Sequence, residues 1–289
     1  MKLSRVNLRV CGSKLSANRV RLALGTLGIA SVAATVWLGF WGTPPSANMG
    51  QRVRLLYIHP AVAWVAYLAF GVAAVASVLY LWGRTRSLAW DRLAVASAEV
   101  GVVFCGLTLV SGSIWGRATW GVWWAWDARL DSTALLFVCY VGYLVLRRVP
   151  ADRAVRARRC ALAALVSFVL VPVSYLSVYW FNSLHQTGTV LDPQRQIKVN
   201  GIMLLTMLLG FCALTVVYAW MVMHRYQVEV LEERLEDEAL DLALAAETRR
   251  VGVQTVGAQV TVTQTAGPQH VVVEVAPAQD VASGEVVAR

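Results

Sequence analysis

The sequence predicts an all-α integral membrane protein with six transmembrane helices. Of its 289 residues, 57% are hydrophobic and only 15% are charged, and the mean hydropathy is +0.56, which is too apolar for a soluble protein of this size. Six apolar runs are each long enough to cross a bilayer. The net charge of +9 comes largely from short basic clusters that flank these runs, so it indicates membrane topology and not a nucleic-acid partner.

The apolar runs and their flanking charges predict how the chain crosses the membrane. The spans are expected at residues 20–41, 58–82, 93–114, 132–148, 160–181 and 201–223. Lys and Arg are concentrated before the first span, between spans two and three, and between spans four and five. Because basic flanks stay in the cytoplasm, we expect both termini to be cytoplasmic and the loop between spans three and four to lie on the outer side.

Composition divides the chain into four segments. Residues 1–19 form a basic cytoplasmic N-terminus, and residues 20–225 form the six-span membrane domain. Residues 226–250 are predicted to form an acidic amphipathic cytoplasmic helix, whose apolar seam suits a weak coiled coil, a partner helix or a solvated extension of span six. Residues 251–289 are predicted to be mostly disordered, with alternating valines that favour at most a marginal strand.

The short outer segment 115–132 carries an unusual density of tryptophan. Five of the twelve tryptophans lie in it, at Trp115, Trp120, Trp123, Trp124 and Trp126. On an α-helix, Trp120, Trp123 and Trp124 would share one face with Asp127 and Asp131, whereas Trp126 and Arg129 would point elsewhere. Either Asp131 or Ser132 is expected to cap span four. The alternative is an interfacial aromatic belt, but a belt usually places only one or two tryptophans at each helix end.

Two histidines, His59 and His185, are predicted to lie on the same outer side as the tryptophans. Two neutral imidazoles suit the two axial positions of a haem iron, and indole rings suit the flat macrocycle. The outer arginines Arg54, Arg117 and Arg129 are candidates for binding the haem propionates, and Asp127 is a candidate for orienting an indole or imidazole N–H.

Other chemistries fit the sequence less well. It contains no His-x-x-x-His or Cys-x-x-Cys spacing for zinc or covalent haem, and no phosphate-binding loop for ATP. We therefore expect a binding protein without an ATPase or catalytic residues of its own.

The segment Trp-Gly-Val-Trp-Trp-Ala-Trp-Asp-Ala-Arg-Leu-Asp-Ser, residues 120–132, resembles the tryptophan-rich WWD signature of a superfamily of haem-handling proteins. With Tyr-Ile-His-Pro before span two and the His185 loop, the chain is similar over residues 20–225 to the cytochrome c maturation protein C family, also called haem exporter protein C. The resemblance implies haem b held without a covalent bond, with His59 and His185 as axial ligands. It assigns the platform to Trp120, Trp123, Trp124, Trp126 and Asp127, beside Trp115, and the propionates to Arg129 and Arg54.

The same resemblance implies location and partners. It places the protein in the bacterial inner membrane, where it would present haem at the periplasmic face to a membrane-anchored haem chaperone during cytochrome c biogenesis. It implies ATP-binding cassette ATPase and permease subunits and a small single-span subunit as further partners. Two alternatives stay open: a haem lyase that attaches haem directly to apocytochrome c, and a membrane redox protein of the b type.

Overall fold

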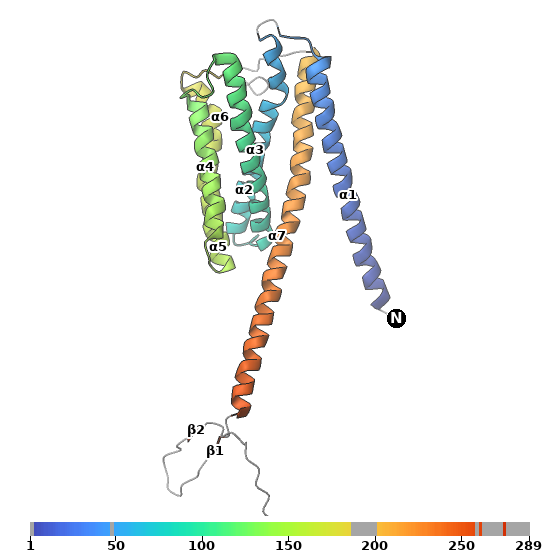
Figure 1. Cartoon of the computed structure of the whole chain (residues 1–289), viewed down its shortest axis with the longest axis vertical. Coiled ribbons are helices and arrows are strands. Elements are labelled where there is room, and N and C mark those ends of the chain that lie inside the picture. Colours follow the sequence, from blue (N-terminus) through green and yellow to red (C-terminus); the bar gives the residue numbers. More distant parts are fainter. Residues whose placement is uncertain (1–2, 47–48, 186–200, 258–259, 262–273, 276–289) are drawn as a thin grey trace, which may run out of the picture. The chain divides into compact units, whose positions relative to one another are not determined.

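The computed structural model describes residues 3–46, 49–185, 201–257, 260–261 and 274–275. Its two compact units are Met1–Val230 and Leu231–Arg289. The helices are α1 (Leu3–Trp37), the π-helix η1 (Leu38–Gly42), the 3-10 helix η2 (Gln51–Tyr57), α2 (His59–Leu81), α3 (Leu88–Trp120), α4 (Ala128–Arg148), α5 (Arg153–Phe168), α6 (Leu170–Trp180) and α7 (Gly201–Gly257). Figure 1 shows the helices of the first unit side by side.

The prediction of six membrane-spanning helices is confirmed. Within the described part of the chain, six helical segments are long and apolar enough to cross a bilayer. They are Asn18–Gly42, Gln51–Leu81, Leu88–Trp120, Ala128–Arg148, Arg153–Trp180 and Gly201–Arg249. The fifth combines α5 and α6, which are separated at Val169. Pro172 in the first turn of α6 has no backbone N–H to donate to Phe168, which accounts for the break.

Small side chains let α2 and α3 pack closely over much of their length. Ala66, Ala69 and Ala73 of α2 and Ala96 and Ala98 of α3 are all buried in the largest apolar cluster. Phe70 and Tyr140 stack in the same cluster, with ring centroids 3.7 Å apart. In a bilayer, such close packing holds helices together where the hydrophobic effect cannot.

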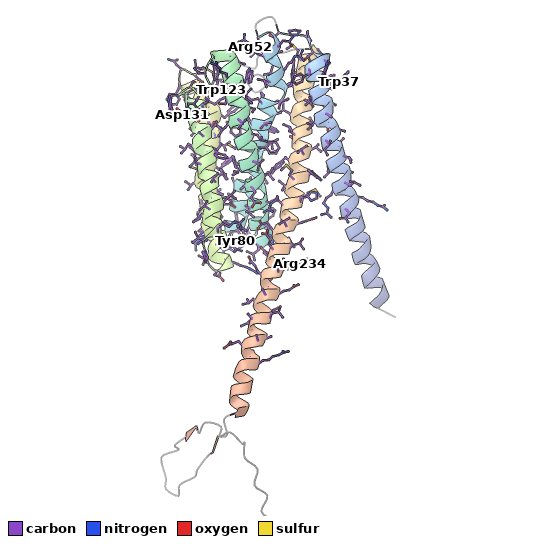
Figure 2. All side chains as sticks on the ribbon, viewed as in Figure 1. Trp37, Arg52, Tyr80, Trp123, Asp131 and Arg234 are labelled. Atoms are coloured by element: carbon purple, nitrogen blue, oxygen red, sulfur yellow. The ribbon has the colours of Figure 1, made fainter. Side chains whose placement is uncertain are left out.

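The helix ends gather the predicted site residues at one end of the first unit. Trp37, Arg52, Trp123 and Asp131 lie at this end, and Tyr80 lies at the opposite end (Figure 2). We call the end that carries Trp37, Arg52, Trp123 and Asp131 the tryptophan end. His59 begins α2 there, Pro60 occupies the first turn of α2, and the chain leaves α3 at Trp120 and enters α4 at Ala128.

Two sequence expectations for this region are wrong. The tryptophan segment is not one helix, because α3 ends at Trp120 and Gly121 adopts a left-handed conformation with φ 80°. The cap of α4 is neither Asp131 nor Ser132 but Asp127, which is extended and accepts the Arg129 backbone N–H at 3.0 Å. An aspartate at this position satisfies a helix N–H that has no partner in its own helix, so α4 begins four residues earlier than span four was expected to begin.

The remaining predicted segments are only partly described. α7 runs without interruption through span six and the acidic segment 226–250. In the second unit, Leu231, Leu235 and Leu242 of the predicted seam are exposed, and Val260–Thr261 (β1) pairs antiparallel with Glu274–Val275 (β2). Most of the predicted disordered segment 251–289 lies outside the described residues, as do residues 186–200 of the outer loop.

Candidate functional site

A cavity of about 300 Å³ opens at the tryptophan end of the first unit. This volume is at the lower end of the range of about 300–1,000 Å³ that is typical of small-molecule sites. Side chains from α2, α3, α4, α6 and α7 line it, together with residues of the segments that follow α3 and α6. They include His59, Trp64, Tyr67, Trp115, Trp120, Trp124, Arg129, Thr133, Tyr175, His185, Met207 and Phe211. The cavity therefore brings together residues that are more than 120 positions apart in the sequence.

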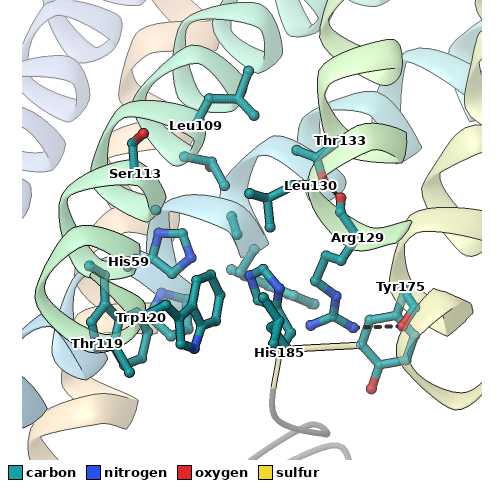
Figure 3. A pocket seen from close by; sticks show the side chains of 18 of the residues that line it. His59, Leu109, Ser113, Thr119, Trp120, Arg129, Leu130, Thr133, Tyr175 and His185 are labelled. Carbon is teal, nitrogen blue, oxygen red and sulfur yellow. Dashed lines mark hydrogen bonds between the residues drawn. The ribbon is translucent and has the colours of Figure 1, made fainter. Parts of the chain in front are cut away.

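His59 enters the cavity from the first turn of α2 (Figure 3). Its Nδ1 lies 2.9 Å from Ser111 Oγ of α3, and its ring meets Trp115 edge to face at a centroid distance of 5.5 Å. Gly112 gives His59 room, because a Cβ there would lie 3.1 Å from His59 Cε1, closer than an ordinary van der Waals contact. Ser111 Oγ also lies 2.7 Å from the Leu107 carbonyl, which can only accept a hydrogen bond. Ser111 therefore donates to Leu107 and accepts from His59 Nδ1–H.

His185 enters the same cavity from the chain after α6 (Figure 3). Its Nδ1 lies 3.3 Å from Asp127 Oδ1, and its ring meets Trp120 edge to face at 5.0 Å. Because a carboxylate oxygen accepts, Nδ1 of His185 carries the proton and Nε2 keeps its lone pair. By the same argument, Nε2 of His59 keeps its lone pair, so both histidines offer the same nitrogen to a ligand.

Asp127 connects the His185 segment to the start of α4. Its side chain is only 2% exposed. It accepts hydrogen bonds from the Leu184 backbone N–H at 2.8 Å, the Ser183 hydroxyl at 3.1 Å and the Arg129 N–H at 3.0 Å. Although burial opposes ionisation, these hydrogen bonds hold the pKa of Asp127 below its usual range. The carboxylate therefore stays ionised and fixes the orientation of His185.

The pKa of His185 is also lowered. Burial is the larger cause and the nearby Arg129 guanidinium adds to it, while Asp127 opposes only part of the shift. The neutral imidazole, which is the form that binds a metal, is therefore favoured at this position.

The five tryptophans of the segment divide into two groups. Trp115, Trp120 and Trp124 line the cavity. Trp123 and Trp126 do not line it, and Trp126 is 89% exposed. The turn at Gly121 breaks the common helical face, because Trp120 is the last residue of α3 and Trp124 follows the turn, yet both line the cavity.

The three candidate arginines differ in whether they line the cavity. Arg129 lines the cavity, donates from Nη2 to the Tyr175 carbonyl at 2.7 Å and lies over the Tyr175 ring at 5.9 Å. Arg54 does not line the cavity, because its guanidinium donates to Gln51 and to the Phe40 carbonyl and lies over the Phe40 ring. Arg117 donates to the Gly121 carbonyl. Asp131 lies outside the cavity lining, and its buried Oδ1 has no hydrogen-bond partner among the described residues.

Several residues of the site carry no signal in the sequence. Nothing in the sequence distinguishes Ser111, Ser174 and Ser183 from other serines in apolar or loop segments. Their positions near His59, the cavity and His185 depend on contacts between distant segments. Only Gly112, one position after Ser111, hints at a close approach.

Comparisons with known proteins place most of the chain in one family. The family described as "Heme exporter protein C" matches residues 12–241. The chain is 33% identical over 225 residues to "Heme exporter protein C" of Haemophilus influenzae, covering 78% of this chain and 88% of that protein. It is 38% identical over 168 residues to the Escherichia coli K12 protein of the same name, covering 56% and 67%. It is 31% identical over 168 residues to a "Putative cytochrome c biosynthesis ccmC-like mitochondrial protein" of Marchantia polymorpha, covering 58% and 70%. The chain belongs to the heme exporter protein C family.

Proposed function

We propose that this protein binds haem b without a covalent bond at the periplasmic face of the bacterial inner membrane. It then presents the haem to a periplasmic haem chaperone for cytochrome c biogenesis. The observation that carries the proposal is that His59 and His185 line one cavity. Each imidazole is oriented through Nδ1, by Ser111 and by Asp127, which leaves both Nε2 atoms available as ligands.

The rest of the cavity suits a flat, apolar ligand with acidic groups. Trp115, Trp120 and Trp124 supply indole surface for a macrocycle. Arg129 supplies a cation for a propionate. Arg54 stays a weaker candidate, because Phe40 and Gln51 already engage its guanidinium outside the cavity lining.

Family membership supports a proposal about partners. A haem-presenting subunit needs a chaperone to accept the haem, and we propose that ATP-binding cassette subunits and a small single-span subunit complete the complex. The exposed Trp123 and Trp126 adjoin cavity-lining Trp124 in sequence, so the same end of the molecule offers apolar surface to an approaching partner.

The test of haem ligation is spectroscopic. Purified wild-type protein should bind haem with a bis-histidine absorption spectrum, and His59→Ala and His185→Ala should each abolish that spectrum and the loading of the chaperone. His224→Ala is the matched control, because His224 packs on Trp220 of α7 and does not line the cavity. Retention of the spectrum in both cavity variants would refute the ligand assignment. Attachment of haem to apocytochrome c without a chaperone would favour the haem lyase alternative.

Membrane orientation can be tested by labelling single cysteines. In a variant whose five native cysteines are replaced by alanine, Trp126→Cys should react with a membrane-impermeant maleimide added outside spheroplasts. Arg86→Cys, in the turn between α2 and α3, should react only after the membrane is permeabilised. The reverse pattern would place the cavity on the cytoplasmic side and exclude periplasmic presentation.

A further inference from the structure

A chain of hydroxyl groups crosses the wall of the cavity from α2 to α4. Tyr67 Oη of α2 lies 2.9 Å from Ser174 Oγ of α6. Ser174 Oγ lies 2.8 Å from Thr133 Oγ1 of α4, and Thr133 Oγ1 lies 2.7 Å from the Arg129 carbonyl. Ser174 is fully buried, whereas Tyr67 and Thr133 line the cavity. Three helices are therefore connected through Ser174 beside the candidate propionate-binding residue.

The chain has a definite direction. The Arg129 carbonyl can only accept, so Thr133 must donate its single hydroxyl proton to it. Ser174 must then donate to Thr133, and Tyr67 must donate to Ser174. This one arrangement uses all three hydroxyl protons within the chain. Removing the Tyr67 hydroxyl would leave the buried Ser174 oxygen without a donor.

α6 holds Arg129 at two points. Ser174 acts through Thr133 on its backbone carbonyl, and the adjacent Tyr175 accepts from its guanidinium through the main-chain oxygen at 2.7 Å (Figure 3). The guanidinium is thereby held at its tip by an acceptor on α6, and the hydroxyl chain ties α6 to α4 one residue before that acceptor. A guanidinium held in this way loses less entropy when it binds an acidic group.

We propose that Tyr67 and Ser174 are positioning residues for Arg129, and that the hydroxyl chain sets the preference of the cavity for a tetrapyrrole with free carboxylates. This inference rests on the proposed function, because it names the group of the ligand that Arg129 recognises. The chain acts on the acidic edge of the ligand, not on its metal or its ring. Its loss should therefore weaken the binding of a carboxylate-bearing porphyrin more than the binding of its ester.

The experiment compares haem with iron protoporphyrin dimethyl ester on the full-length protein in detergent. Wild-type protein should prefer haem. Tyr67→Phe and Ser174→Ala should each reduce that preference about three- to tenfold, the effect of losing one hydrogen bond. Neither substitution should reduce the preference further in an Arg129→Gln background, because the group that they position is then absent.

Tyr140→Phe is the matched control. It removes a buried tyrosine hydroxyl that donates to the Ala164 carbonyl at 3.2 Å outside the cavity lining, and it should leave the preference unchanged. Equal weakening of both porphyrins in Tyr67→Phe and Ser174→Ala, or a full additional effect in the Arg129→Gln background, would overturn the inference while haem binding stands. Wild-type protein that binds neither porphyrin would overturn the proposed function itself.

Discussion

At the level of single residues, the site depends on the buried carboxylate of Asp127, which accepts hydrogen bonds from several groups at once. Asp127 caps α4, holds Leu184 and Ser183, and orients His185. Its pKa lies below the usual range because these hydrogen bonds outweigh burial. The pKa of His185 is lowered chiefly by burial and by Arg129. Both shifts favour the pair in which the carboxylate is charged and the imidazole is neutral.

The pKa shifts predict how haem retention depends on pH. A histidine whose pKa is lowered stays neutral as the pH falls through the ordinary value of about 6.5, so its contribution to binding is kept there and lost at lower pH. The carboxylate of Asp127 is lost only below the usual aspartate range. A titration of the haem absorption should therefore show release with a midpoint below about 6.5. His224→Ala should leave this midpoint unchanged, and a midpoint above the ordinary histidine value would contradict the assignment.

At the scale of elements, the turn between α3 and α4 decides which tryptophans reach the cavity. Gly121 has φ 80° and ψ 0°, and nothing would touch a Cβ built on it. The requirement for glycine is therefore conformational and not steric. Because L-residues with a side chain are disfavoured in this left-handed region, the glycine ends α3 directly after Trp120.

Gly121→Ala should lower the stability of the protein by about 1–2 kcal/mol, the cost of a left-handed non-glycine residue. Thermal unfolding in detergent measures the loss. Gly142→Ala is the control, because Gly142 lies inside α4 with open space around its Cβ position. An alanine there should be neutral or stabilising by up to about 1 kcal/mol. Equal effects of the two substitutions would show that the turn is not under this constraint.

At the level of the whole first unit, a group of ion pairs lies at the end opposite the cavity. Arg147 of α4 makes two hydrogen bonds to Asp91 of α3, at 3.0 and 2.9 Å, and lies 3.5 Å from Glu229 of α7. The Arg225 guanidinium of α7 donates a hydrogen bond to the Glu99 carboxylate of α3 and lies 3.3 Å from the Glu229 carboxylate. Glu99, an acidic residue within the third predicted span, therefore has a cationic partner. These ion pairs join α3, α4 and α7.

Arg147→Ala should destabilise the protein by about 3–5 kcal/mol, because it leaves Asp91 and Glu229 buried without their shared cation. Arg148→Ala is the control at an exposed neighbouring position and should cost less than about 0.5 kcal/mol. Thermal unfolding measures both. Because the pairs lie far from the cavity, haem affinity of the folded Arg147→Ala protein should stay within about twofold of wild type. A larger loss of affinity would show that the two ends are coupled.

The six spans and the resemblance to the family could be predicted from the sequence, because apolar run length and a local motif are properties of neighbouring residues. It also proposed His59, His185, Arg129 and the tryptophans as one site. The folded arrangement was needed to find that Trp115, Trp120 and Trp124 line the cavity, that Arg54 does not, and that Asp127 caps α4 beside His185. These outcomes depend on a left-handed glycine and on contacts between distant helices, which periodicity and charge along the chain do not encode.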